Sequence, residues 1–151
     1  MPTTNNRFLT LTENDDDVTV NVTYNAVFSS FERSLSTIGV FFQERITVNG
    51  VDANAPDKIL HIFQSENLPV TAGQGPQTIA RNRSMTVSRK SLDEDFKTID
   101  LIGSPSNPIR IVMFHEDEIR CRIEIVSMGL PSATGLTDQK ILLPHETEEE
   151  L

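Results

Sequence analysis

The chain has 151 residues, a formal net charge of -9 and one cysteine. This length is typical of a single domain with a core of its own. A lone cysteine excludes an intramolecular disulfide and with it the small cystine-rich class of secreted proteins. The acidic balance opposes binding to nucleic acid or to an anionic membrane, because both depend on basic residues.

The segment before Phe8 lacks the apolar stretch and the small-residue cleavage site of a secretory signal. No run in the sequence approaches the ~20 apolar residues of a membrane-spanning helix. We therefore expect a cytoplasmic protein without a membrane span.

Hydrophobic residues alternate with period two through most of the chain, which predicts β-strands. The clearest segment is 18–28, where apolar residues occupy one parity and mostly Thr and Asn the other. In chain order, strands are predicted at residues 7–12, 18–28, 38–48, 58–64, 78–89, 97–102, 109–114 and 119–125. Turn residues separate them, as at Asn49-Gly50. About eight such strands predict an all-β fold, an antiparallel β-sandwich, with a β-barrel as the alternative.

The strands at 109–114 and 119–125 are separated by four polar residues, which predicts a β-hairpin. Cys121 lies in the apolar register of the second of these strands, so we expect a buried small hydrophobe there.

From about Gly129 the alternation is lost. We therefore expect residues 1–128 to form the sandwich domain and residues 129–151 to form an irregular C-terminal extension. Its last part, 144–151, is acidic and is predicted to be a flexible tail.

Familiar catalytic and cofactor motifs are missing from the sequence, which favours a protein that is not an enzyme. A hydrolase is the weaker alternative. It would use the loop histidine His115 as a base beside Glu116 or Asp117, whose negative charge favours a protonated imidazole.

Three arginines, Arg81, Arg83 and Arg89, share one parity of a predicted strand. One interpretation is an exposed basic face that holds RNA or phosphate. The other is an ordinary exposed sheet in which Glu32, Glu44 and Glu124 are available to pair with the arginines across strands.

Acidic clusters at 15–17, 93–95 and 116–118 each lie between two predicted strands. If strands run alternately up and down, these connections emerge at one end of the sandwich. Ca²⁺ takes about 6 to 8 oxygen ligands from such loops, whereas the simpler interpretation is a set of solvated turns. The candidate metal ligands are Asp15, Asp17, Asp93, Asp95 and Asp117.

The leading hypothesis is a non-enzymatic binding or assembly module that acts through a sheet face, an edge or a loop end. Its partner would be another protein or a second copy of the chain. Val40, Phe41 and Phe42 stand together, so one of two strand faces is left for a loop or a partner to cover. The alternative is a Ca²⁺-dependent binding domain that uses the acidic loops, and Ca²⁺ is the only cofactor that the sequence suggests.

Overall fold

The computed structural model describes the backbone of residues 1–51, 55–92, 96–104, 107–114, 117–127, 130–143 and 147–150, and the side chains of 1–51, 55–92, 118–127 and 134–143. Its elements are β1 (Thr3–Asn14), β2 (Asp17–Phe28), α1 (Ser30–Leu35), η1 (Ser36–Ile38), β3 (Phe42–Gly50), β4 (Lys58–Ile62), β5 (Glu66–Leu68), β6 (Gln77–Ser88), η2 (Arg89–Leu92), β7 (Phe96–Ser104), β8 (Asn107–Phe114), β9 (Asp117–Ser127), β10 (Leu130–Leu136), β11 (Lys140–Leu142) and β12 (Thr147–Glu150).

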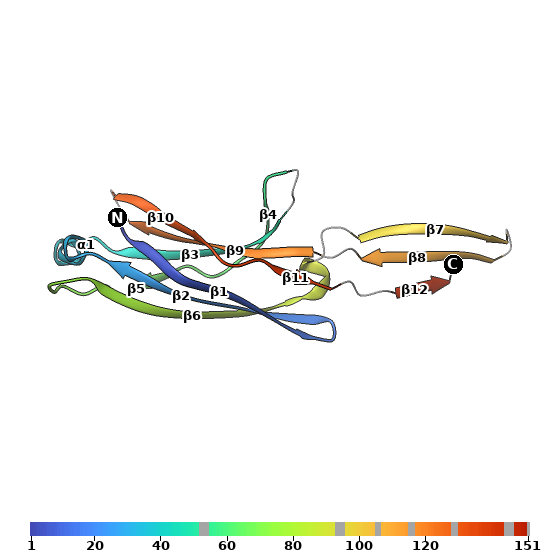
Figure 1. Ribbon diagram of the computed structural model, residues 1–151, viewed down its shortest axis with the longest axis horizontal. Helices are drawn as coiled ribbons and strands as arrows, with labels where there is room; N and C mark the ends of the chain where they lie inside the picture. The colour runs from blue at the N-terminus through green and yellow to red at the C-terminus, as the bar shows by residue number, and fades with distance from the viewer. Residues whose placement is uncertain are drawn as a thin grey trace.

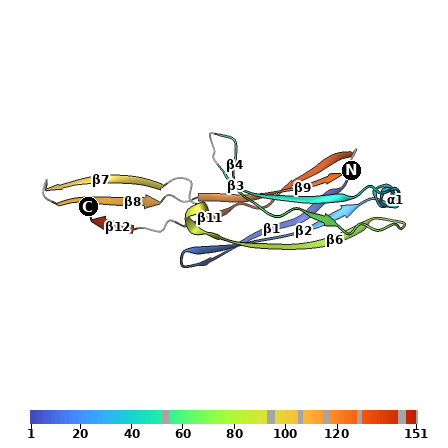
Figure 2. The same cartoon turned by 180° about the vertical axis from the view of Figure 1, so that it is seen from behind.

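Two antiparallel sheets pack face to face as a β-sandwich (Figures 1 and 2). Sheet A has the order β1-β2-β6. Sheet B has the order β10-β9-β3-β4, with β5 also paired to β3 and β11 to β9. The predicted sandwich is confirmed, and because neither sheet closes on itself among the described strands, the barrel alternative is wrong.

The core lies between the sheets and uses the parity that the sequence predicts. The six apolar residues on one parity of β2, from Val18 to Phe28, are all buried, as are the apolar residues of β9 from Ile119 to Ile125. Cys121 is one of them, so its predicted burial is confirmed. Each fully buried side chain of the size of Val, Ile or Phe stabilises the fold by about 1.5–3 kcal/mol.

The segment after Gly129 differs from the expectation of irregular structure. Strands β10 and β11 both pair with β9, so residues 130–136 and 140–142 belong to sheet B. Pro131 and Gly135 are poor strand formers, but the free edge of β9 offers backbone partners that outweigh this propensity. The flexibility of the acidic tail and the boundary near residue 128 stay predictions.

The predicted hairpin of 109–114 with 119–125 is wrong. Strand β8 pairs with β7 and β12 in a separate three-stranded sheet, sheet C, whereas β9 pairs with β3. Sheet C extends beyond one end of the sandwich, opposite to α1 (Figure 1). The pairing of β9 with β3 is favoured because it places four β9 side chains in the core.

Polar contacts hold the β1 edge of sheet A against sheet B. The Arg7 Nε donates to the carbonyl of Leu136 at 2.8 Å, and the amide of Leu9 donates to Asp138 Oδ1 at 2.7 Å. A Cβ on Gly135 would come within 2.4 Å of Thr4 Oγ1, so this close approach requires glycine.

The described helices are all short: none has both the length and the apolar character needed to cross a bilayer.

Candidate functional site

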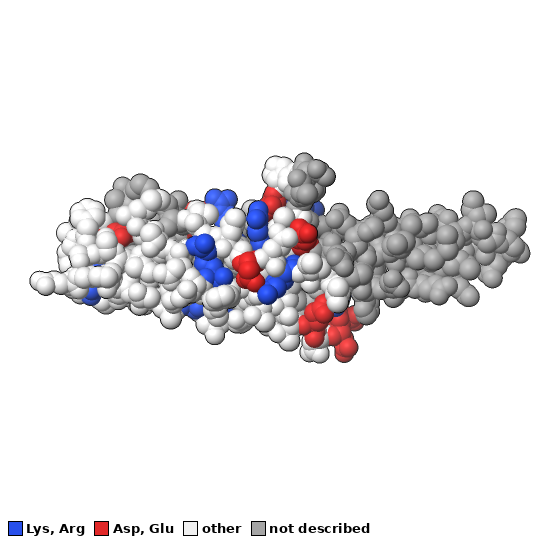
Figure 3. Space-filling view, in the orientation of Figure 1, with Lys and Arg blue, Asp and Glu red and all other residues white. Residues whose placement is uncertain are grey.

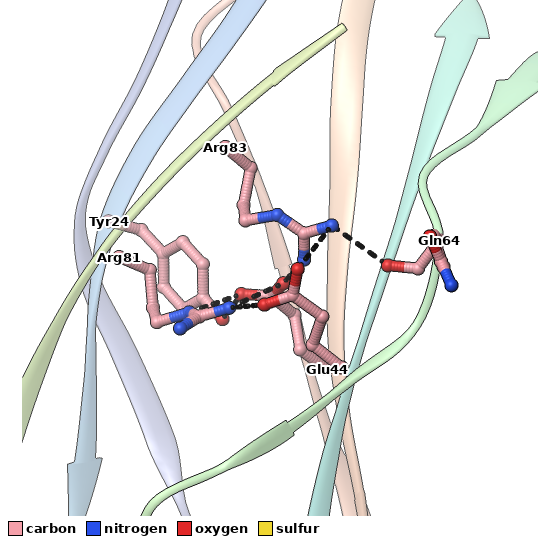
Figure 4. A network of polar contacts seen from close by, with 6 residues as sticks. Tyr24, Glu44, Gln64, Arg81 and Arg83 are labelled. Carbon is pink, nitrogen blue, oxygen red and sulfur yellow. Dashed lines mark hydrogen bonds and ion pairs between the residues drawn. The ribbon is translucent and has the colours of Figure 1, made fainter.

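A cluster of charged side chains lies between the sheets near the β6 edge (Figure 4). At its centre is Glu44 of β3, whose side chain is fully buried (0% exposed). It accepts hydrogen bonds from the Tyr24 hydroxyl at 2.5 Å and from the Arg81 Nε at 3.0 Å. Arg83 also donates to this carboxylate. The buried charge therefore has partners from β2 and β6.

The outer part of the cluster is formed by the segment around β5. Glu66 accepts from Arg81 at 2.6 Å and lies 3.2 Å from Arg83. Arg83 also donates to the carbonyl of Gln64 at 2.9 Å and lies over the Phe63 ring. Two carboxylates thus face two guanidinium groups, and their formal charges cancel.

The contacts of the cluster shift the pKa of Tyr24, Arg81 and Glu66 away from neutral pH. Burial, together with the hydrogen bond to Glu44, raises the pKa of Tyr24 above its usual range. The hydrogen bond to Glu44 likewise raises the pKa of Arg81. The hydrogen bond from Arg81 lowers the pKa of Glu66. A neutral phenol that only donates and carboxylates that are already paired offer neither a base nor a nucleophile.

Sequence reasoning placed these arginines on an exposed face, and the structure corrects this. Arg81 and Arg83 share the parity of Ile79, Met85 and Val87, and that parity points between the sheets. Glu44 shares its parity with the buried Phe42 and Ile46, as the sequence alone already indicates. The shared parity with apolar residues therefore indicated an inward position for these charged side chains. Ionised side chains are rarely fully buried, which is why the opposite face was expected.

A second contact of catalytic residue types joins β4 and η2. His61 Nε2 lies 2.7 Å from Ser91 Oγ, and this hydroxyl donates to the carbonyl of Ser88 at 2.6 Å. Since the hydroxyl has one hydrogen, the imidazole Nε2 must be the donor to it. In this arrangement His61 does not act as a base toward Ser91.

The predicted metal ligands are placed only in part. Asp15 and Asp17 are exposed at the turn between β1 and β2, where acidic side chains gather in Figure 3. Asp93 and Asp95 lie outside the described residues, and the side chain of Asp117 lies outside them too. Among the described side chains, no three of the types His, Cys, Asp and Glu are grouped to hold a metal.

Arginines contact acidic residues at the end of the sandwich where the sequence predicts the acidic loops. The amide of Arg89 donates to the carbonyl of Asp16 at 2.7 Å and its guanidinium pairs with Glu13 at 3.0 Å. Arg120 pairs with Asp57 at 2.8 Å. These ion pairs reduce the repulsion that a cation would relieve. The Ca²⁺ site stays a prediction, testable by thermal unfolding in EDTA and in Ca²⁺.

The hydrolase alternative stays a prediction. His115 and Glu116 lie outside the described residues. The one cysteine is not a nucleophile either, because burial, with the nearby Asp138, raises the pKa of Cys121 to about 12.

At the end opposite to sheet C, the segment 31–41 exposes three large apolar side chains. Phe31 on α1 is 65% exposed, Ile38 on η1 74%, and Phe41 before β3 50%. The neighbouring Phe42 is fully buried, so the chain covers the side of Phe42 and leaves the side of Phe41 half exposed.

The polypeptide around these three residues is firmly held. Ser29 and Glu32 form a capping box at the start of α1. Arg33 donates to the carbonyls of Thr71 and Ala72 at 2.9 and 3.2 Å, and to those of Gln74 and Gly75. The exposed side chains therefore stand on an anchored backbone.

No family model, curated protein or solved structure matches this chain.

Proposed function

We propose that this protein is a non-enzymatic assembly module that associates with a second copy of itself, head to tail. The α1 end, defined by Phe31, Ile38 and Phe41, would dock on sheet C of the next copy. The observation that carries the proposal is the exposure of these three large apolar side chains on one anchored segment.

Single exposed apolar residues are normal on protein surfaces, whereas grouped ones mark interaction sites. The α1 end groups three within eleven positions of sequence, two of them aromatic. Aromatic residues are enriched at protein–protein interfaces, because they bury a large area with little loss of side-chain entropy.

Sheet C supplies the complementary surface in this proposal. Four of the nine residues of β7 and five of the eight residues of β8 are Phe, Ile, Leu, Val or Met. Among the described strands, β7, β8 and β12 pair only with one another. An antiparallel sheet of this composition needs at least one face covered, and a second copy provides the cover.

The two surfaces lie at opposite ends of the long axis (Figure 1). Contact between two different surfaces is heterologous, so each copy keeps one free surface of each kind after pairing. Such contacts form rings when the rotation closes and filaments when it does not.

The test is the mass in solution of the wild type and two variants. The first variant replaces Phe31, Ile38 and Phe41 by Ser. The second replaces Ile99 and Ile111, which are register partners in sheet C, by Asp. We expect the wild type to be oligomeric and each variant to be monomeric. An equimolar mixture of the two variants retains one intact pair of surfaces and should form a dimer.

A matched control replaces Ile59 and Ile62, which are 57% and 65% exposed on β4, by Ser and should leave assembly unchanged. The thermal unfolding curve of each variant shows whether the sandwich is intact. A monomeric wild type would overturn the proposal, and a mixture that stays monomeric would exclude its head-to-tail geometry.

A further inference from the structure

The outer face of sheet A has no ionisable side chain over five consecutive rows of three residues. We call these fifteen positions the neutral face. Their rows, read across β1, β2 and β6, are Thr3-Val27-Thr78, Asn5-Asn25-Ala80, Phe8-Thr23-Asn82, Thr10-Asn21-Ser84 and Thr12-Thr19-Thr86. Asp17 follows one row later, at the turn. Since ordinary surfaces are roughly 25–35% charged, about four or five charges are expected on fifteen positions.

Strand propensity explains only part of this composition. Threonine is favoured in strands, but asparagine is depleted from them. The neutral face nevertheless carries Asn5, Asn21, Asn25 and Asn82. Residues that oppose local propensity are expected at functional sites, where their chemistry is needed.

Side-chain hydrogen bonds hold part of the neutral face in place. The Asn21 amide donates to Asn82 Oδ1 at 2.8 Å and to Ser84 Oγ at 2.6 Å. The hydroxyls of Thr19 and Thr86 lie 3.1 Å apart. Amide and hydroxyl groups each have further donor or acceptor capacity beyond these contacts. The face is therefore a pre-ordered array of uncharged hydrogen-bonding groups.

A β-bulge adds one aromatic side chain to the array. The register of β1 on β2 shifts between Asn5 and Phe8, and Asn6 takes the left-handed φ of 50°. Without the extra residue Phe8 would point into the core. With it, Phe8 lies on the outer face, 59% exposed, and Leu9 is buried instead. Bulges often serve to redirect a side chain in this way.

Arg7 fixes the bulge. Its guanidinium donates to the Thr4 carbonyl at 2.9 Å and to Thr4 Oγ1 at 3.0 Å, and its Nε donates to Leu136 on β10. Arg7 thus holds a backbone irregularity that exposes the Phe8 ring beside Thr23.

We propose that the neutral face binds a neutral polysaccharide. Such a polymer is uncharged and presents hydroxyl groups that match the Asn, Thr and Ser array. The C–H face of a sugar ring packs on an exposed aromatic ring, which Phe8 supplies. Nucleic acids and anionic glycans require basic residues, and this face has none. The surface is separate from the α1 end and from sheet C, so the inference does not depend on the proposed assembly.

The test uses three neutral hexasaccharides as probes: β-1,4-linked glucose, α-1,4-linked glucose and β-1,4-linked mannose. Binding is followed by NMR amide shifts at millimolar sugar, with hyaluronan fragments as the anionic comparison. We expect at least one neutral probe to bind and to shift amides of β1, β2 and β6. The Phe8→Ser variant should weaken this binding about tenfold, which corresponds to the loss of about 1.4 kcal/mol.

The matched control is Ile62→Ser, which removes an exposed apolar side chain on β4 of sheet B and should leave sugar affinity unchanged. A second variant, Asn82→Lys, places a charge on the neutral face and should also weaken binding. Because position 82 is exposed, the change should leave the fold intact. The proposal is overturned if no neutral probe binds, if only hyaluronan binds, or if both variants keep the affinity of the wild type. Face-to-face dimers that Asn82→Lys abolishes, without sugar binding, would overturn it too.

Discussion

The two faces of sheet A distribute charge in opposite ways. The inner face carries Arg81 and Arg83, which meet the buried Glu44, whereas the outer face between Thr3 and Thr86 has no charge. In an ordinary antiparallel sheet the hydrophobic side is inside and the charged side outside. Along β6, charge lies inside and neutral polar groups lie outside.

The difference indicates separate tasks for the two faces. β6 is an edge strand of sheet A, and inward-pointing charges on an edge strand hinder pairing with another chain. A buried ion cluster contributes little net stability but disfavours arrangements that leave a charge unpaired. The inner face therefore disfavours arrangements that leave Glu44 unpaired, whereas the outer face is the surface for which we propose sugar binding.

The largest expected effect is at the inner face. Glu44→Ala would leave Arg81 and Arg83 without their buried partner, and we expect it to lower the free energy of unfolding by about 3–5 kcal/mol. Urea unfolding measures this. Glu124→Ala on the outer side of sheet B is the control, with an expected loss below about 1 kcal/mol because its pair with Arg122 is on the surface. Equal losses in both variants would show that the cluster has no special role.

A smaller effect is expected for the phenol of the same cluster. Tyr24→Phe keeps the ring in the core but removes the donor to Glu44, so we expect a loss of about 1.5–3 kcal/mol, the range for hydrogen bonds to charged groups. The measurement is again urea unfolding, combined with Glu44→Ala in a double-mutant cycle. Strictly additive losses would contradict a direct coupling between the two side chains.

The outer face should respond in the opposite direction. Asn25→Thr replaces a residue depleted from strands by one that strands favour, so we expect a gain of a few tenths to about 1 kcal/mol. The reverse change on the same strand, Thr23→Asn, should lower stability. If Asn25→Thr destabilises the sandwich, the asparagines of the neutral face contribute to folding and are not held there for another purpose.

The smallest expected effect concerns pH. The hydrogen bond from Arg81 lowers the pKa of Glu66 below its ordinary value of 4.5. A lowered folded-state pKa contributes stability above the unfolded-state pKa, and this contribution is lost as pH falls through the folded-state value. Wild type should thus exceed Glu66→Gln in stability at neutral pH, and the two should converge in acid. A difference that persists in acid would exclude this ionisation as its source.

Several features could be predicted because they depend on local pattern. Alternation in 18–28 and in 119–125 identified both central strands and their buried parity, including Cys121. Turn residues in the sequence correctly marked the boundaries between most of the strands. Three others could not be predicted, namely strands β10 and β11, the pairing of β9 with β3 and the bulge before Phe8. The pairing of β9 with β3 joins segments that are distant in sequence. Strands β10 and β11 and the bulge depend on the free edge or the register of a partner strand, which no apolar pattern within one segment describes.

The sequence by itself determined that this protein is built of β-strands with one buried face, because a period-two apolar pattern places its apolar residues on a single face of a sheet. Whether the strands form a sandwich or a barrel was decided by the tertiary structure. Only the tertiary structure decided that Glu44 meets Arg81 and Arg83, that neutral side chains form a continuous outer face, and that sheet C stands apart from the sandwich. The physical reason is that parity assigns a residue to a face, whereas contact across faces and strands depends on register and on sheet order.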